Sequence, residues 1–176
     1  MNARKLITLT LACIVVHFSA SAQGLSVGLF NSPKGFGISL DHNATADILN
    51  SYTVYADVYG MYTGTNTSAG VKMVYLHSNR LSSMDTEYAR LDFYLGPGAS
   101  TGYVRDHNYE GFGFILTADV SFAVRACFKR NFDIELINIA ELGFIVGEDG
   151  GHTQLSIYDN GLLQALIPAL KLMIRF

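Results

Sequence analysis

The stretch FILTADVSFAVRACF, residues 114–128, alternates between two kinds of side chain. Every even-numbered residue in it is apolar, whereas the odd positions include Thr117, Asp119, Ser121, Arg125 and Cys127. Because successive side chains of a strand point to opposite faces, this pattern predicts a long β-strand with one apolar face. Many such strands in a soluble sandwich would need a larger core than 176 residues supply. A closed barrel in a lipid bilayer satisfies both faces, because lipid covers the apolar one and the interior takes the polar one.

The same alternation recurs along the rest of the chain, in segments separated by turn residues such as Asn31–Lys34 and Lys129–Asn131. We therefore predict an all-β fold, an antiparallel eight-stranded up-and-down transmembrane β-barrel with a polar, side-chain-filled interior. Pro97 should cause a bulge or bend, because proline cannot donate to a ladder. Residues 147–168 are expected to form the longest loop, with 154–167 ambiguous between strand and helical turn. The predicted strands lie near residues 25–29, 36–40, 51–62, 70–77, 89–103, 114–128, 132–146 and 170–176.

The N-terminal residues are typical of an export signal. Arg4 and Lys5 precede an apolar run, and Ala20-Ser21-Ala22 offers a small-residue cleavage site. Residues 1–22 are therefore predicted to be a signal peptide, and residues 23–176 a single barrel domain. Cleavage leaves Cys127 as the one cysteine, so no internal disulfide is expected. The chain has 12 basic and 15 acidic residues, a balance that gives no indication of nucleic-acid binding.

Charged residues at the inward positions test the strand registers independently. Six acids and five bases fall there, which is close to balance. An eight-stranded barrel is just wide enough to be filled by its own side chains, and unpaired charges in it are costly. We therefore expect an interior network of ion pairs and hydrogen bonds rather than a pore. The predicted members are Asp57, Lys72, Arg90, Asp92, Asp119, Arg125, Asp133, Glu135, Glu141, Lys171 and Arg175.

The cleavable signal, the alternating strands and the ending Leu170-Lys171-Leu172-Met173-Ile174-Arg175-Phe176 together resemble a known family. These features are similar to the small eight-stranded outer-membrane barrels of Gram-negative bacteria, of the OmpX and OmpA transmembrane-domain type. The resemblance implies that Phe176 is the assembly signal read by the barrel-assembly machinery. It also implies location in the cell outer membrane, contact with lipid and lipopolysaccharide, and possible pairing with another envelope protein through the loops. No enzymatic motif, cofactor or metal site comes with it, so a non-enzymatic structural or surface-interaction role is expected.

Two other functions fit parts of the sequence. Tyr75-Leu76-His77-Ser78-Asn79 resembles the active-site strand of the outer-membrane lipid A deacylases, with Glu87 as a candidate third member. In that family one residue separates the His from the Ser, whereas His77 and Ser78 are adjacent and should point to opposite faces. The second alternative is a secreted lipocalin-like binding barrel, whose apolar face would line the interior. Periodicity alone does not distinguish inside from outside, but the strand length and the terminal Phe176 favour the membrane barrel.

Overall fold

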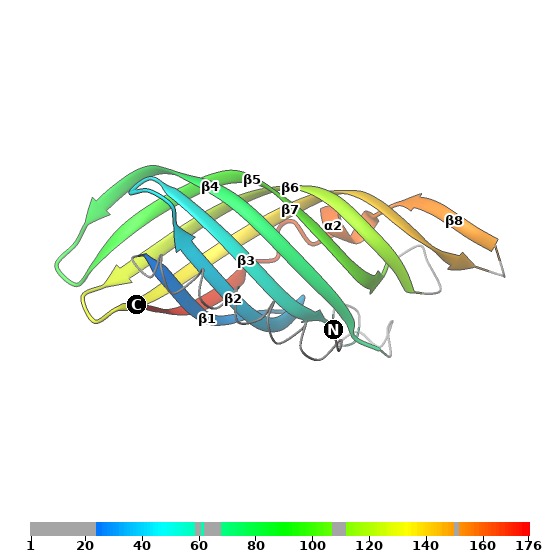
Figure 1. Cartoon of the computed structure of the whole chain (residues 1–176), viewed down its shortest axis with the longest axis horizontal. Helices are drawn as coiled ribbons and strands as arrows, with labels where there is room; N and C mark the ends of the chain where they lie inside the picture. Colours follow the sequence, from blue (N-terminus) through cyan, green and yellow to red (C-terminus); the bar gives the residue numbers. More distant parts are fainter. Residues whose placement is uncertain (1–23, 59–60, 62–67, 107–111, 150–151) are drawn as a thin grey trace, which may run out of the picture.

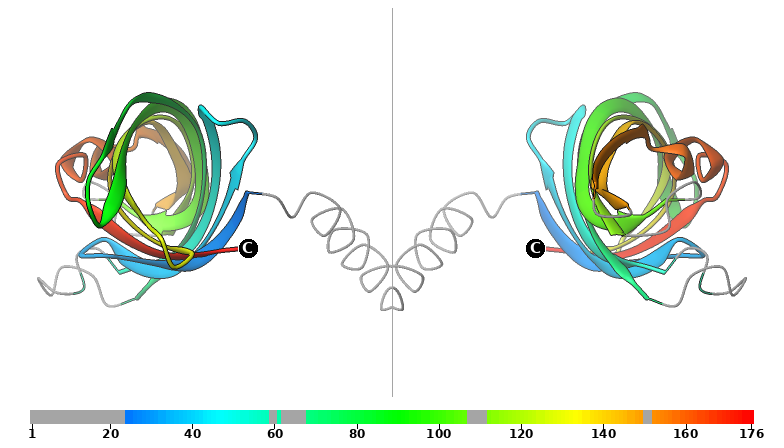
Figure 2. Two further views of the ribbon diagram at one scale, coloured as in Figure 1. Left: turned by 90° about the vertical axis from the view of Figure 1, so that its left-hand side faces the viewer. Right: turned by 90° about the vertical axis from the view of Figure 1, so that its right-hand side faces the viewer.

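The computed structural model describes residues 24–58, 61, 68–106, 112–149 and 152–176, so the predicted signal peptide lies outside the described residues. The chain forms a closed antiparallel β-barrel of eight strands (Figure 1). The ring is visible along the barrel axis in Figure 2. Its strands are β1 (Leu25–Ser32), β2 (Gly35–Asn43), β3 (Ile48–Asp57), β4 (Gly70–Asp85), β5 (Ala89–Arg105), β6 (Phe112–Phe128), β7 (Phe132–Asp149) and β9 (Ala169–Arg175). The predicted all-β, eight-stranded antiparallel barrel with a polar interior is confirmed.

The two ends of the barrel differ. The end that carries Leu25, Phe176 and the connections 44–47, 86–88 and 129–131 is called the terminal end, and the opposite one the distal end. Asn131 has a φ of 55°, which asparagine tolerates, and this closes the tight β6–β7 hairpin that the sequence predicts. Strands β1, β2 and β3 have 8, 9 and 10 residues, close to the roughly 9–11 of a membrane-spanning strand. Strands β4 to β7 have 16 to 18 residues, so the wall that they form is longer than the wall formed by β1, β2 and β3.

The predicted loop 147–168 contains secondary structure. Strand β7 continues to Asp149, and β8 (His152–Ile157) folds back on it as a ninth strand outside the ring. A short helix, α2 (Asp159–Leu163), follows before the chain enters β9 (Figure 1). The sequence left residues 154–167 open between strand and helical turn, and both are present there, as β8 and α2. The expected start of the loop at residue 147 was wrong, because β7 continues to Asp149.

Strand β7 has three successive neighbours on one of its edges. It pairs with β9 up to Ile137 and with β8 from Phe144 onward. Between these pairings, the segment 158–168 lies against residues 138–143, which we call the β7 seam. Asn138 donates a hydrogen bond from Nδ2 to the carbonyl of Ala165 at 3.2 Å. This contact accounts for a polar residue at an outward position that otherwise interrupts the apolar pattern of the strand.

Two details of the strands differ from the prediction. The pairing of β5 with β6 runs through Pro97 without a shift, and the register shift in this region lies between Arg80 and Ser82 of β4. The β4–β5 pairing lapses at Gly96 and Pro97 without changing register, which accommodates the missing proline N–H. In the described residues, β3 ends at Asp57 rather than near residue 62, and β4 continues to Asp85 rather than ending near residue 77. No helix in the described residues is long and apolar enough to cross a membrane.

Candidate functional site

Four charged side chains meet inside the barrel near its terminal end, and we call them the central cluster: Asp41, Arg125, Glu135 and Lys171. All four are fully buried. The Arg125 Nε donates to Glu135 Oε2 at 2.6 Å, and the guanidinium also pairs with Asp41. The Lys171 ammonium lies 2.9 Å from Glu135 Oε1 and 3.5 Å from Asp41 Oδ1. The cluster thus balances two cations with two anions, and each of the strands β2, β6, β7 and β9 contributes one of the four residues.

A second buried group, the distal cluster, lies toward the other end of the interior. Lys72 forms an ion pair with Glu141 and donates to the Tyr158 hydroxyl at 3.2 Å. Asp119 accepts hydrogen bonds from Ser100 and Thr117, each at 2.6 Å. Asp57 is also buried on this side. Hydroxyl donors supply the partners of the Asp119 carboxylate, and Lys72 supplies that of Glu141, which is what burial of a carboxylate requires.

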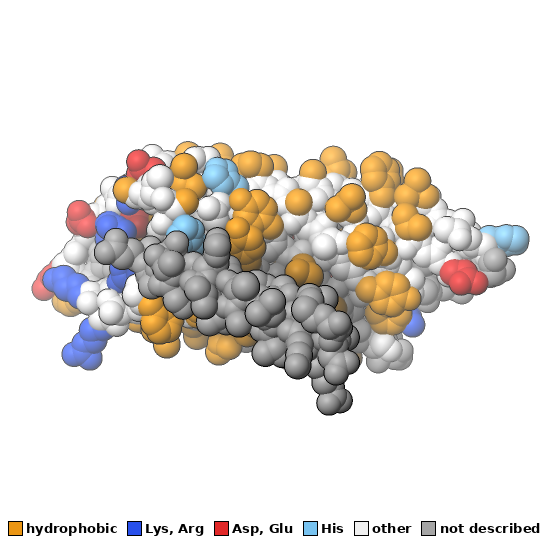
Figure 3. All heavy atoms as spheres, viewed as in Figure 1, with side chains coloured by type: hydrophobic (Ala, Val, Ile, Leu, Met, Phe, Trp, Pro, Cys, Tyr) orange, Lys and Arg blue, Asp and Glu red, His pale blue; other side chains and the backbone are white. Residues whose placement is uncertain are grey.

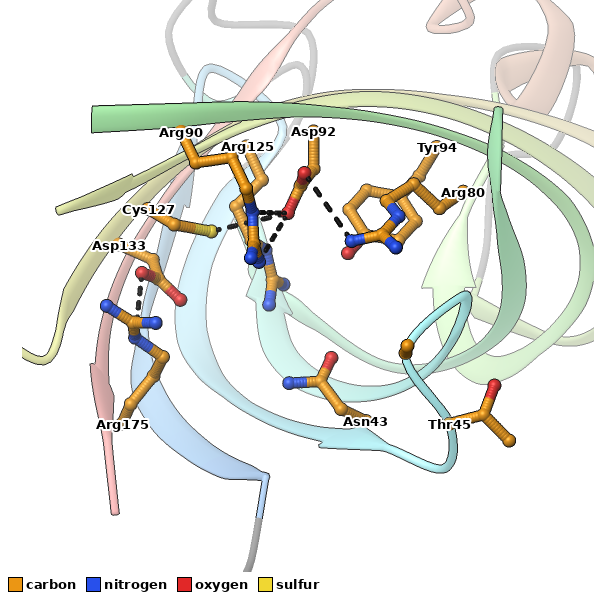
Figure 4. A pocket seen from close by; sticks show the side chains of 11 residues that line it. Asn43, Thr45, Arg80, Arg90, Asp92, Tyr94, Arg125, Cys127, Asp133 and Arg175 are labelled. Atoms are coloured by element: carbon orange, nitrogen blue, oxygen red, sulfur yellow. Dashed lines mark hydrogen bonds and ion pairs between the residues drawn. The ribbon is translucent and has the colours of Figure 1, made fainter. Parts of the chain in front are cut away.

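The terminal mouth of the barrel is a polar cavity of about 160 Å³ (Figure 4). Asp92 is fully buried at its wall and pairs with Arg90 at 2.9 Å and with Arg80 at 3.8 Å. Arg175 of β9 lies 3.1 Å from Asp133 of β7, which is two strands from Asp92 in the ring. Figure 4 shows these arginines pointing toward the carboxylates, so the wall of the mouth is lined by ion pairs.

Apolar side chains fill the space between the charged clusters. Phe30 and Tyr55 pack with ring centroids 4.8 Å apart, and Leu76, Tyr94 and Ile137 belong to the same buried cluster. The interior therefore consists of layers of ion pairs and packed apolar groups. Such an arrangement provides stability and leaves little open lumen in a barrel of eight strands.

The structure buries nine of the eleven predicted interior residues: Asp57, Lys72, Asp92, Asp119, Arg125, Asp133, Glu135, Glu141 and Lys171. The other two, Arg90 and Arg175, have partly exposed side chains at the terminal mouth. They still lie on the inner side, where each meets a buried aspartate. The eleven residues are divided among the two clusters and the mouth rather than forming one continuous network.

The interior polar residues missed by the sequence prediction include Asp41, Lys34 and Tyr158. Asp41 follows the outward Leu40, so alternation would have predicted its inward position if the predicted strand had been one residue longer. Lys34 lies in the β1–β2 turn and donates to the carbonyl of Ile139 on β7 at 3.4 Å. Burial lowers the pKa of Lys34 to about 8. Tyr158 belongs to the connection after β8, and no periodic signal marks either of these two as inward.

The candidate catalytic residues are not brought together. Ser78 points into the barrel, where it is buried 3.3 Å from the hydroxyl of Ser121. His77 is half-buried on the outer side, and its Nδ1 lies 2.8 Å from Asn50 Oδ1. Glu87 is exposed in the turn between β4 and β5 at the terminal end. The described residues contain no cluster of three or more His, Cys, Asp or Glu side chains arranged to hold a metal ion.

The outer face of the barrel is predominantly apolar (Figure 3). On β6, Leu116 is 64% exposed and Val120 58% exposed, while their chain neighbours Thr117 and Ser121 are buried. The same holds on other strands, where Leu29, Ile38, Val54, Met73, Leu142, Phe144, Leu172 and Ile174 are exposed. No protein-family model, curated protein or solved structure matches the chain.

Proposed function

We propose that this chain is an integral outer-membrane β-barrel protein with a packed interior and a non-enzymatic role, acting through its distal connections and its lipid-facing wall. The observation that carries this proposal is the inverted distribution of polarity. Charged side chains such as Arg125 and Lys72 are fully buried, whereas Leu, Ile, Val and Phe side chains face outward on every barrel strand. In water this arrangement would expose most of the apolar side chains, and contiguous apolar patches of that kind mark a contact surface. A bilayer supplies the contact.

The geometry of the strands supports the same proposal. Each backbone group in a bilayer needs a partner, and a closed antiparallel ring provides one along every shared edge. Outward aromatic rings lie toward the terminal end, where Phe128 and Phe132 approach with ring centroids 6.1 Å apart. Others, such as Phe114 and Phe144, lie toward the distal end. Aromatic residues at both ends of an apolar belt are typical of membrane-spanning barrels.

A non-enzymatic role is the better fit to the outward His77 and the inward Ser78. A nucleophile and its base need to lie within hydrogen-bonding distance, and these two side chains lie on opposite sides of the barrel wall. Under this proposal the termini face the periplasm, and the β7–β8 hairpin with α2 faces the outside of the cell. Lipid, lipopolysaccharide and an envelope protein bound at the distal end are the partners we propose, with the barrel-assembly machinery acting during biogenesis.

The proposal is tested by expressing the full chain in a Gram-negative host and separating the membranes. We expect the protein to fractionate with the outer membrane and to migrate differently on a gel with and without heating, because a folded barrel resists the detergent. A protein that is recovered folded in the soluble fraction, and that shows no change in migration on heating, would overturn the proposal in favour of the lipocalin-like alternative. Release of acyl chains from lipid A by the purified protein, abolished in His77→Ala, would overturn the non-enzymatic role.

A further inference from the structure

A groove of about 290 Å³ crosses the outer face of β3, β4, β5 and β6, and its lining is almost entirely apolar. Its floor is low because Ala99 occupies an outward position between larger neighbours. Tyr52, Tyr75 and Met73 form one side, and Leu116 closes the other. The registers place Tyr75 opposite Ala99 on β5, so one large ring stands directly beside the small residue. All residues that line the groove belong to strands of the barrel wall.

A row of polar side chains lies at the terminal end of this groove. Asn50 is the register partner of His42 on one side and of His77 on the other, so three neighbouring strands contribute to the row. The Tyr75 hydroxyl donates to Asn50 Oδ1 at 3.1 Å, and His77 Nδ1 lies 2.8 Å from the same oxygen. Tyr75 therefore belongs both to the groove and to the polar row. The row is two residues along the strand from the groove, which is roughly 7 Å.

These contacts fix the chemistry that the row presents. Asn50 Oδ1 is an amide oxygen, so it accepts from both the Tyr75 hydroxyl and the His77 Nδ1–H. With its proton on Nδ1, the neutral His77 ring has an acceptor at Nε2. The Asn50 amide nitrogen supplies the donors of the row. Amide N–H groups are costly to expose to hydrocarbon and are satisfied by oxygen atoms of a polar ligand. The polar row therefore favours a headgroup with acceptor oxygens at Asn50, and the groove favours an apolar chain.

We propose that this combined surface is a binding site for one phospholipid, whose phosphate accepts from the Asn50 amide in the polar row of His42, Asn50 and His77 and whose acyl chain lies in the groove over Ala99. This inference rests on the proposed membrane location. The polar row is on the terminal side of the groove, so the lipid's head points toward the terminal end and its chain toward the middle of the barrel. That orientation fits a lipid of the periplasmic leaflet. Lipopolysaccharide, whose phosphates lie in the outer leaflet, would need the opposite order.

The site is tested with the mature chain folded in a non-ionic detergent and titrated with dimyristoylphosphatidylglycerol, with bound lipid counted by native mass spectrometry. We expect a one-to-one complex that forms more readily than with dimyristoylglycerol, which has the same chains and no phosphate. Ala99→Phe should fill the groove and weaken the complex at least tenfold, and Ala99→Leu should do so to a smaller degree. Ala126→Phe on β6 is the matched control, because Ala126 is also an outward alanine of the barrel wall and lies outside the groove.

The polar row is tested separately by the double substitution Asn50→Ala with His77→Ala. We expect this variant to bind both lipids equally, because it keeps the groove and loses the donors. Equal binding by the wild type, Ala99→Phe and Ala126→Phe would overturn the site, as would a wild type with no preference for the phosphate. A one-to-one complex with lipopolysaccharide that displaces the phospholipid would overturn the leaflet assignment. If the chain folds without detergent and does not insert into vesicles, the membrane proposal itself is overturned. This outcome is measured by folding and insertion, so it is distinguishable from a failure of lipid binding.

Discussion

Arg125 of β6 and Glu135 of β7 are direct register partners, and their side chains meet inside the barrel with Arg125 Nε donating to Glu135 Oε2 at 2.6 Å. The same arginine also pairs with Asp41, on the far side of the barrel in sequence and in the ring of strands. One side chain therefore connects strands β2, β6 and β7 across the interior. The fold is held by such cross-barrel contacts as well as by the ladder of hydrogen bonds in its wall.

Replacing Arg125 with Met should destabilise the barrel strongly, because it leaves Asp41 and Glu135 with one cation between them. The loss expected for breaking a buried ion pair is about 3–5 kcal/mol. The control is Arg130→Met in the turn between β6 and β7, where the side chain is exposed and the expected change is within about 0.5 kcal/mol. Urea unfolding in lipid vesicles, followed by gel migration, measures both. Equal losses for the two variants would mean that the central cluster is not what holds the interior.

Replacing Val120 with Arg tests the outer face. Val120 is 58% exposed on β6, and a charge placed there near the bilayer midplane should cost about 2–4 kcal/mol. Thr153→Arg on β8 introduces the same charge at an exposed position outside the ring, where the cost should stay within about 0.5 kcal/mol. Folding yield in vesicles and the free energy of unfolding are the measurements. If both variants fold equally well, Val120 does not face lipid.

Alternation predicts most of this fold because each barrel strand except β4, whose register shifts between Arg80 and Ser82, keeps one parity, and the eleven predicted charges all fall on the inner side. Asp41 was missed because the predicted strand ended at Leu40, one residue short. Alternation could not predict the positions of Lys34, Tyr158 and α2. Each lies in a connection between strands, and the surrounding strands determine the path of that connection. The polar row of Asn50 and His77 was not recognised either, because only the register between β3 and β4 places these two residues side by side.

Replacing Gly161 with Ala tests the contact of α2 with the β7 seam. A Cβ at this position would lie 2.4 Å from the backbone oxygen of Glu141, so the helix would have to move away from β7. We expect a loss of about 1–3 kcal/mol, the usual range for overpacking. Leu166→Ala removes a side chain that is 89% exposed in the same segment and should change stability by less than about 0.5 kcal/mol. Hydrogen exchange at residues 138–143 should increase in the first variant and stay unchanged in the second.

The stability of the barrel should rise as the pH increases from about 8 toward 10.5. Burial lowers the pKa of Lys34 in the turn between β1 and β2 to about 8 from its ordinary value of 10.5, so in this window the unfolded chain binds the proton and the folded chain does not. Unfolding is then less favourable at higher pH, by up to about 3 kcal/mol for this one group. Lys34→Met should remove that increment, as measured by urea unfolding at several pH values. A slope unchanged in Lys34→Met would show that other groups cause it.

Deleting Phe176 separates assembly from stability. In the structure its backbone N–H donates to the carbonyl of Leu25 at 2.9 Å, while its ring is 70% exposed on the outer side of the terminal end. The contact closes the last pairing between the two ends of the chain. Its loss removes one hydrogen bond, about 1 kcal/mol, and the burial of one aromatic ring in lipid, about 1–3 kcal/mol.

If Phe176 is also the residue that the assembly machinery reads, deletion should reduce insertion in cells far more than it reduces the stability of protein refolded in detergent. Phe176→Tyr is the control, because it keeps the terminal aromatic ring and should insert nearly as well as the wild type. Outer-membrane yield and the free energy of unfolding are measured on the same three proteins. A deletion that lowers both to the same degree would give Phe176 a structural role alone. A deletion that changes neither would mean that the chain end contributes nothing to closing β9 against β1.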